Sequence, residues 1–297
     1  MRLLLISPNV SGHYTGSLLR SVTRALDHAS IGWDVIGPID LIGAGYDLYV
    51  GVGDELLRKR RDIVRRIRDI GGTSADFRSR FLPRKPKAWL QDALRDRADY
   101  VLTHFRAGSY WHPRALYVGQ GVNDDLLYPE HDAIFTIFVD HRMDSRRSHV
   151  QAILDQCAEL AQRRRVRIWH HTSEGIVENQ FVEDRRPVKS LPFAEIAAYY
   201  RRTHVFLPTH RETQGMVGAE IGVCGGLVLL RPLTYPPERF VQIPHRFYWS
   251  RISWPDFVDV NANRAKTMMH FGVDAFAARL ERAVSTIVSA RRRAGRL

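Results

Sequence analysis

The sequence predicts an α/β protein in which short parallel strands alternate with helices. The first observation is a recurring unit, in which a short apolar run is followed by a loop rich in glycine or polar residues and then by a helical run. The second is the order of these units, because alternating strands and helices are typical of doubly wound parallel sheets. The third is the length of 297 residues, which at roughly 150 residues per domain predicts two small domains.

The first such unit opens the chain. Residues 2–7 form an apolar strand-like run, residues 8–16 a loop with two glycines, and residues 17–28 a helical run. Further strands are predicted at 32–36 and 47–53, from their apolar character and the turn residues that bound them. A Gly-x-x-x-Gly loop is not a dinucleotide fingerprint, and it serves equally as a plain tight turn.

Residues 55–70 predict a single amphipathic helix with a strongly basic outer side. The formal net charge of the whole chain is +12 and its pI is near 10.1. A charge of this size favours anionic partners or surroundings, such as an anionic membrane surface or nucleic acid. A merely solvated basic face explains the same residues equally well, and charge alone does not choose among the three.

The most informative segment is residues 203–232. An apolar run ends at Pro208, Glu212 stands in the loop that follows, and a helix is predicted to begin next to Gly215. The free amides and the dipole of such a helix start favour a phosphate group. Glu220 lies eight positions after Glu212, deeper on the predicted helix, so that both carboxylates flank one ligand.

Two ordinary solvated acids are the alternative for this pair of glutamates, since glutamates are mostly exposed. The position of the pair favours a binding role, because open parallel sheets bind ligands at the carboxyl ends of their strands. After the helix, residues 225–226 are a glycine pair that predicts a left-handed cap, and residues 227–230 predict a buried strand.

The segment resembles the signature of the family 4 retaining glycosyltransferases, which have the GT-B fold of two Rossmann-like domains facing across a cleft. That family has Glu, seven residues, Glu. Glu212-Thr213-Gln214-Gly215 stands where the family has Glu-Gly-Phe-Gly, so Thr213 is a departure. The resemblance implies that Glu212 meets the sugar hydroxyls of a nucleotide-sugar donor and that Glu220 bonds its ribose.

The same resemblance implies a diphosphate site at the start of the helix. Its contacts would be Thr213 and the backbone amides of Gly215, Met216 and Val217. In the first domain, the loop after the first strand lines the site in this family, so Gly12 and His13 are candidate contacts as well.

A second match lies upstream, where residues 117–129 resemble the Gly-rich linker between the two domains of that family. An apolar strand at 134–139 follows. Arg142 and Arg147 keep the five-residue spacing at which the family has an Arg and a Lys, and the resemblance implies that both contact the phosphates. A solvated basic loop is the alternative for this stretch. The family's acceptor-side histidine has no counterpart at residues 51–54.

Three regions are therefore expected. Residues 1–122 form an acceptor-side Rossmann-like domain, residues 123–273 a nucleotide-sugar-binding Rossmann-like domain, and residues 274–297 a helix that returns to the first domain. The function implied by the resemblance is transfer of a sugar with retention of configuration, with Arg142 and Arg147 polarising the leaving phosphate and Glu212 positioning the sugar.

A nucleic-acid-binding or DNA-modifying protein with the same fold and a basic surface is the alternative function. An oxidoreductase is disfavoured because neither early loop has Gly-x-Gly-x-x-Gly. No cofactor is expected, and the absence of any Asp-x-Asp predicts metal independence. The base of the nucleotide is open, and so is the acceptor: an anionic membrane lipid, a polysaccharide or DNA.

Cys157 and Cys224 are the only cysteines, and their spacing fits neither a zinc site nor a disulfide framework, which favours a reducing compartment. No signal peptide and no apolar run near the ~20 residues of a membrane span is found. We therefore expect a cytoplasmic protein whose only mode of membrane attachment is peripheral.

Overall fold

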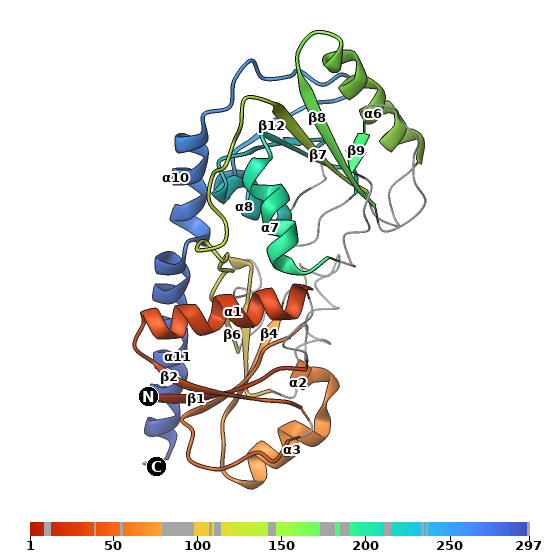
Figure 1. The fold of residues 1–297 in the computed structure, drawn as a ribbon. Helices are drawn as coiled ribbons and strands as arrows, with labels where there is room; N and C mark the ends of the chain where they lie inside the picture. Colours follow the sequence, from red (N-terminus) through yellow and green to blue (C-terminus); the bar gives the residue numbers. More distant parts are fainter. Residues whose placement is uncertain are drawn as a thin grey trace. The chain divides into compact units, whose positions relative to one another are not determined.

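The computed structural model describes residues 1–8, 13–38, 40–53, 56–78, 98–106, 109, 114–141, 147–172, 182–184, 191–210, 215–232, 235 and 237–295. In this part of the chain, strands pair only in parallel and form two six-stranded sheets. The chain divides into two compact units, of which the first is Met1–Gly121 with Val273–Leu297 and the second is Val122–Gly272. The α/β class with two parallel sheets, predicted from the sequence, is confirmed (Figure 1).

The first unit has the strand order β2-β1-β3-β4-β5-β6. Alternate residues of β1 enter different cores, because successive side chains of a strand point to opposite faces of a sheet. Leu3 and Leu5 pack with α1 and α11, while Leu4 and Ile6 pack with α3. The bounds are β1 Arg2–Ile6, α1 His13–His28, β2 Gly32–Ile36, β3 Leu48–Gly51, α2 Leu56–Lys59, α3 Arg61–Asp69, β4 Ser74–Arg78, β5 Tyr100–Thr103, β6 Ala115–Tyr117 and α11 Val273–Ala294.

The single helix expected at 55–70 is wrong, because the structure has two helices, α2 and α3, that meet at Arg60. The reason lies in a residue distant in sequence. The carboxylate of Asp76 on β4 accepts hydrogen bonds from the amides of Leu57 (3.1 Å) and Arg58 (3.2 Å). This holds the first turn against the sheet, and α3 then starts in a new direction with Ile63 and its neighbours in the core.

The second unit has the strand order β12-β11-β10-β7-β8-β9. Helix α6 packs on one face of this sheet, against Ile137 and Val139 of β7, and helices α7 and α8 pack on the other, against Phe138 and Phe206. The bounds are β7 Phe135–His141, α6 Arg147–Ala161, β8 Val166–Thr172, β9 Val182–Asp184, α7 Phe193–Arg202, β10 Val205–Pro208, α8 Met216–Val223, β11 Leu227–Leu230, α9 Pro237–Gln242, β12 His245–Phe247 and α10 Val260–Phe271.

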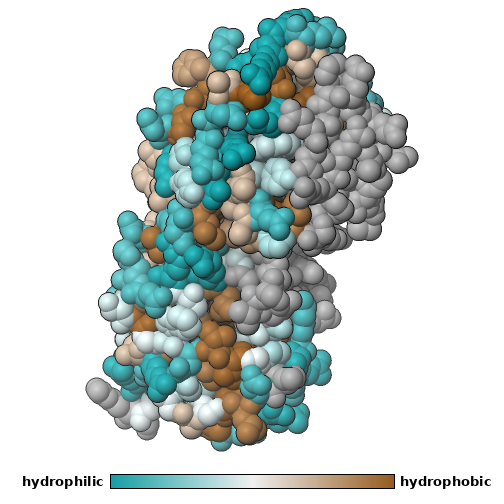
Figure 2. Space-filling view, in the orientation of Figure 1, coloured by the Kyte–Doolittle hydropathy of each residue, from teal (hydrophilic) through white to brown (hydrophobic). Residues whose placement is uncertain are grey.

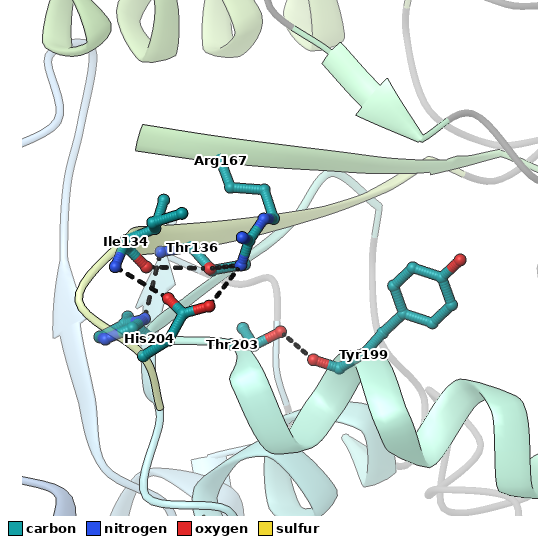
Figure 3. A network of polar contacts seen from close by, with 7 residues as sticks. Ile134, Thr136, Arg167, Tyr199, Thr203 and His204 are labelled. Atoms are coloured by element: carbon teal, nitrogen blue, oxygen red, sulfur yellow. Dashed lines mark hydrogen bonds and ion pairs between the residues drawn. The ribbon is translucent and has the colours of Figure 1, made fainter. Parts of the chain in front are cut away.

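A polar network fixes the amino ends of β7 and β8 (Figure 3). Arg167 Nη1 donates to Asp132 Oδ2 at 2.9 Å and to Thr136 Oγ1 at 3.3 Å. The amide of Thr136 donates to Nδ1 of His204 at 3.1 Å, so this nitrogen carries no proton. The ring centroids of His131 and His204 are 4.3 Å apart, with the ring planes tilted by 37°. Burial, together with the neighbouring His204, lowers the pKa of His131 to about 4, and burial also lowers the pKa of His204.

None of the helices in the described ranges combines the length and the apolar character that crossing a bilayer requires.

Candidate binding site at the carboxyl edge of the second sheet

The start of helix α8 is the centre of the candidate site. Strand β10 ends at Pro208, the described chain continues to His210, and it resumes at Gly215. The backbone of Gly215 is left-handed (φ 69°, ψ 27°), and this residue directly precedes Met216. Glycine suits this position because the left-handed conformation is strained for other residues. The first amides of the helix have no partners within the helix itself, and with the helix dipole they favour an anion.

Tyr235 and Arg239 fix the position of this helix start. A Cβ atom placed on Gly215 would lie 2.7 Å from Cε1 of Tyr235 and 3.3 Å from Cγ of Arg239, and one on Gly218 would lie 2.7 Å from the Tyr235 hydroxyl. The backbone of α8 can approach Tyr235 this closely only because both positions are glycine. Neither Tyr235 nor Arg239 was singled out from the sequence.

Arg239 packs against the start of α8 through the aliphatic stem of its side chain. Its side chain is fully buried, its Nη1 donates to Oε1 of Gln242 at 2.5 Å, and its guanidinium lies over the ring of Phe271, 4.9 Å from the centroid. Buried arginines are rare unless they are paired. Arg239 is therefore part of the buried packing that fixes the start of α8.

Glu220 lies in the second turn of α8, five residues after Gly215, or about 7.5 Å along the helix axis at the standard rise. Only 6% of it is exposed. Burying a carboxylate costs free energy, and this arrangement is enriched at functional sites. The structure thus confirms the helix and places Glu220 in its second turn.

Asp140 and His210 lie at the same edge of the sheet, on neighbouring strands. Asp140 is near the end of β7 and His210 follows β10, and both are buried, at 1% and 7% exposure. Nδ1 of His210 is 3.9 Å from Oδ2 of Asp140, which is longer than a direct hydrogen bond. Thr209 holds the two strand ends together, because its hydroxyl and its amide both donate to the carbonyl oxygen of Asp140, at 2.5 Å and 3.2 Å.

The residues predicted from the sequence are placed to different extents. Gly215, Met216, Val217 and Glu220 come together in α8. Gly12, Arg142, Glu212 and Thr213 lie outside the described residues. The backbones of His13 and Arg147 begin α1 and α6, so each starts the first helix after a strand of its sheet.

His104 directly follows strand β5, a position from which a side chain either faces a site or packs in the core. It is fully buried, and its ring lies 5.7 Å from the ring of Phe77 in the core of the first unit. This placement favours the structural role. Within the described ranges, no group of three or more His, Cys, Asp or Glu side chains is arranged to hold a metal ion.

No protein-family model matches the sequence, and a comparison with curated proteins finds no match. Solved structures do match. The catalytic domain of starch synthase IV from Arabidopsis thaliana, bound to ADP and acarbose, aligns with a TM-score of 0.62 at 9% identity, over 97% of this chain and 99% of that one. UDP-GlcNAc 2-epimerase from Neisseria meningitidis, bound to UDP-GlcNAc, gives 0.57 at 9% identity, over 97% and 99%.

The lipopolysaccharide outer core galactosyltransferase WaaB, in its apo form, gives a TM-score of 0.56 at 11% identity, over 96% of this chain and 99% of that one. Identities this low establish the fold and nothing finer. The similarity extends over nearly the whole length of each chain, so it includes both parallel sheets and the final helix. The chain therefore has the GT-B fold, with two Rossmann-like domains.

Proposed function

We propose that the chain is a glycosyltransferase that takes a sugar from a nucleoside-diphosphate sugar bound at the start of α8. The observation that carries this proposal is the left-handed Gly215 at the head of a buried helix, the first helix after strand β10, with the side chains of Tyr235 and Arg239 packed against it. Among the proteins that share the fold, one is named a galactosyltransferase and another a starch synthase. Two were solved with ADP or UDP-GlcNAc bound.

In this proposal the amides of Gly215, Met216 and Val217 hold the diphosphate, since a helix start supplies oriented N–H groups and a positive dipole end. Glu220 accepts hydrogen bonds from the ribose hydroxyls. Asp140 and His210 supply a carboxylate and an imidazole at the same sheet edge, where they support the groups that hold the sugar.

The remaining roles follow the family resemblance. Glu212 positions the sugar, and Arg142 and Arg147 neutralise the charge that develops on the leaving phosphate. Gly12, His13 and Thr213 are further contacts to the nucleotide sugar. Departure of the diphosphate gives oxocarbenium character at the anomeric carbon. We propose that the acceptor hydroxyl bonds to the same face through its oxygen and gives its proton to the departing phosphate, so that configuration is retained. We propose that these steps need no metal ion.

Calorimetric titration with UDP, GDP and ADP, with and without a chelator, tests the nucleotide site. We expect one nucleotide to bind, equally well with the chelator. Glu220→Gln should weaken it about 10-fold to 100-fold, because hydrogen bonds to a charged group contribute about 1.5–3 kcal/mol. Glu281→Gln is the matched control, since Glu281 is exposed on α11 of the first unit. Failure of every nucleotide to bind would refute the proposal.

An acceptor-free incubation separates transfer from epimerisation, because an enzyme of the same fold is an epimerase. A sugar nucleotide that changes configuration with no acceptor present would identify an epimerase. A glycosyltransferase leaves the sugar nucleotide unchanged or slowly hydrolyses it, and the anomeric configuration of its product, read by NMR, then tests retention. The nucleic-acid alternative rests on net charge alone, and none of the three structures compared above supports it.

A further inference from the structure

Two basic segments that are distant in sequence meet on the first unit. Helix α3 exposes four arginines, and the last turn of α11 ends in three more. Nη2 of Arg291 donates to the carbonyl oxygen of Gly71, in the turn that closes α3, at 2.7 Å, and its Nη1 donates to that of Asp47 at 3.1 Å. We define the basic face as Arg61, Arg65, Arg66, Arg68, Arg291, Arg292 and Arg293.

Helix α3 has no apolar side left to offer a partner. Ile63, Val64 and Ile67 are at most 2% exposed and pack against Leu4 and Ile6 of the central strand. Turning this side toward a lipid would remove it from the core of the unit, at a cost of several buried aliphatic side chains. The helix therefore presents only charged side chains to a partner, its four exposed arginines together with Asp62 and Asp69, which distinguishes it from an amphipathic helix that inserts into a bilayer.

Exposed aliphatic side chains adjoin the basic face. Leu41, in the loop between β2 and β3, is 93% exposed, and Ile70, directly after α3, is 38% exposed. Nη2 of Arg60 donates to the carbonyl oxygen of Pro38 at 3.2 Å, which ties that loop to the start of α3. On the side of the unit drawn in Figure 2, a band of apolar surface runs between hydrophilic side chains.

We propose that this basic face docks the protein on an anionic lipid surface, with Leu41 and Ile70 in shallow contact with the headgroup region. Clustered arginines are attracted to the negative surface of anionic lipids, and isolated aliphatic side chains suit the boundary of the acyl chains. Single-stranded nucleic acids are instead held on aromatic side chains, whereas the apolar residues named here are aliphatic. This docking goes beyond the proposed sugar transfer and does not depend on it.

The expected strength follows from the charge. Each Lys or Arg near an anionic bilayer contributes about fivefold in affinity, or about 1 kcal/mol. Removing three arginines should therefore weaken binding on the order of 100-fold. The attraction should also fall with salt, because the Debye length is only about 8 Å at physiological ionic strength.

The test is vesicle co-flotation of the full chain at low and high salt. The probes are vesicles of phosphatidylcholine alone, the same vesicles with phosphatidylglycerol, and duplex DNA in a parallel gel-shift arm. The test variant is Arg61→Gln/Arg65→Gln/Arg66→Gln. The control is Arg163→Gln/Arg202→Gln/Arg246→Gln, which removes the same charge from exposed positions of the second unit. Thermal unfolding and nucleotide titration of both variants check the fold and the proposed nucleotide site independently.

Salt-sensitive binding to the phosphatidylglycerol vesicles that is lost in the α3 variant and kept in the control supports the proposal. Leu41→Ser should then reduce binding a few-fold at low and high salt alike. Equal losses of vesicle binding in both triple variants would show that binding depends only on net charge, and the basic face would not be a docking site. Binding to DNA but not to vesicles, or to neither, would also overturn the proposal. Because nucleotide binding is measured separately, each of these results leaves the proposed function standing.

Discussion

Substitution of Gly215 by alanine tests the geometry at the start of α8 most directly. The new Cβ would lie 2.7 Å from Cε1 of Tyr235 in a backbone with φ of 69°. The left-handed conformation costs a non-glycine residue about 1–2 kcal/mol, and overpacking costs about 1–3 kcal/mol. We expect Gly215→Ala to destabilise the protein by about 2–5 kcal/mol, measured by urea unfolding, and to weaken nucleotide binding because the helix start must shift.

Gly71→Ala is the matched control. Gly71 has nearly the same backbone angle, with φ of 68°, and no atom lies within 4 Å of its added Cβ. Gly71→Ala therefore costs only the free energy of the left-handed conformation. The difference in the free energy of unfolding between the two variants then measures the contact with Tyr235. Combining Gly215→Ala with Tyr235→Ala should recover about 1–3 kcal/mol in a double-mutant cycle. Gly215→Ala that costs no more than Gly71→Ala would refute the close approach.

Three further outcomes are expected. The free energy of unfolding should fall as the pH drops from about 6.5 toward 4, by less than about 1.4 kcal/mol per pH unit. The reason is that the folded state keeps His131 neutral, with its pKa lowered to about 4. His131→Phe should flatten this pH dependence in urea titrations, and an unchanged slope would contradict the assignment. Burial raises the pKa of Cys157 and Cys224, so iodoacetamide should label them, by mass spectrometry, only after unfolding. Arg239→Met should destabilise by about 1–3 kcal/mol in urea unfolding, because it leaves Oε1 of Gln242 without its bond; a stability equal to that of the parent would show that this bond contributes nothing.

Local patterns were sufficient to predict the central unit of the site. The strand that ends at Pro208, the helix at Met216–Val223 and the strand at Leu227–Leu230 are all confirmed. Each is bounded by proline or glycine, and the apolar runs are too short and too regular for another assignment. Gly225 has the left-handed backbone expected of the cap, with φ of 87°.

Features that depend on distant residues escaped prediction. The break between α2 and α3 depends on Asp76, which lies beyond both helices in sequence. The approach of Asp140 to His210 requires the knowledge that β7 and β10 are neighbours. The one sign of Asp140 in the sequence is its position, because it is a polar residue at the end of a buried strand. Strand β12 has only three residues, His245–Phe247, and no alternation long enough to recognise, so the sequence does not predict it.

Helix α11 also determines the order in which the chain can fold. It supplies Phe276, Leu280 and Ile287 to the core of the first unit, while the second unit is one uninterrupted segment, Val122–Gly272. A ribosome therefore releases every residue of the second unit before the first can close its core, although the first was begun earlier. Until then the face of the nascent first sheet that α1 and α11 share is covered by α1 alone, and this interval of partial exposure is where misfolding or chaperone capture would act.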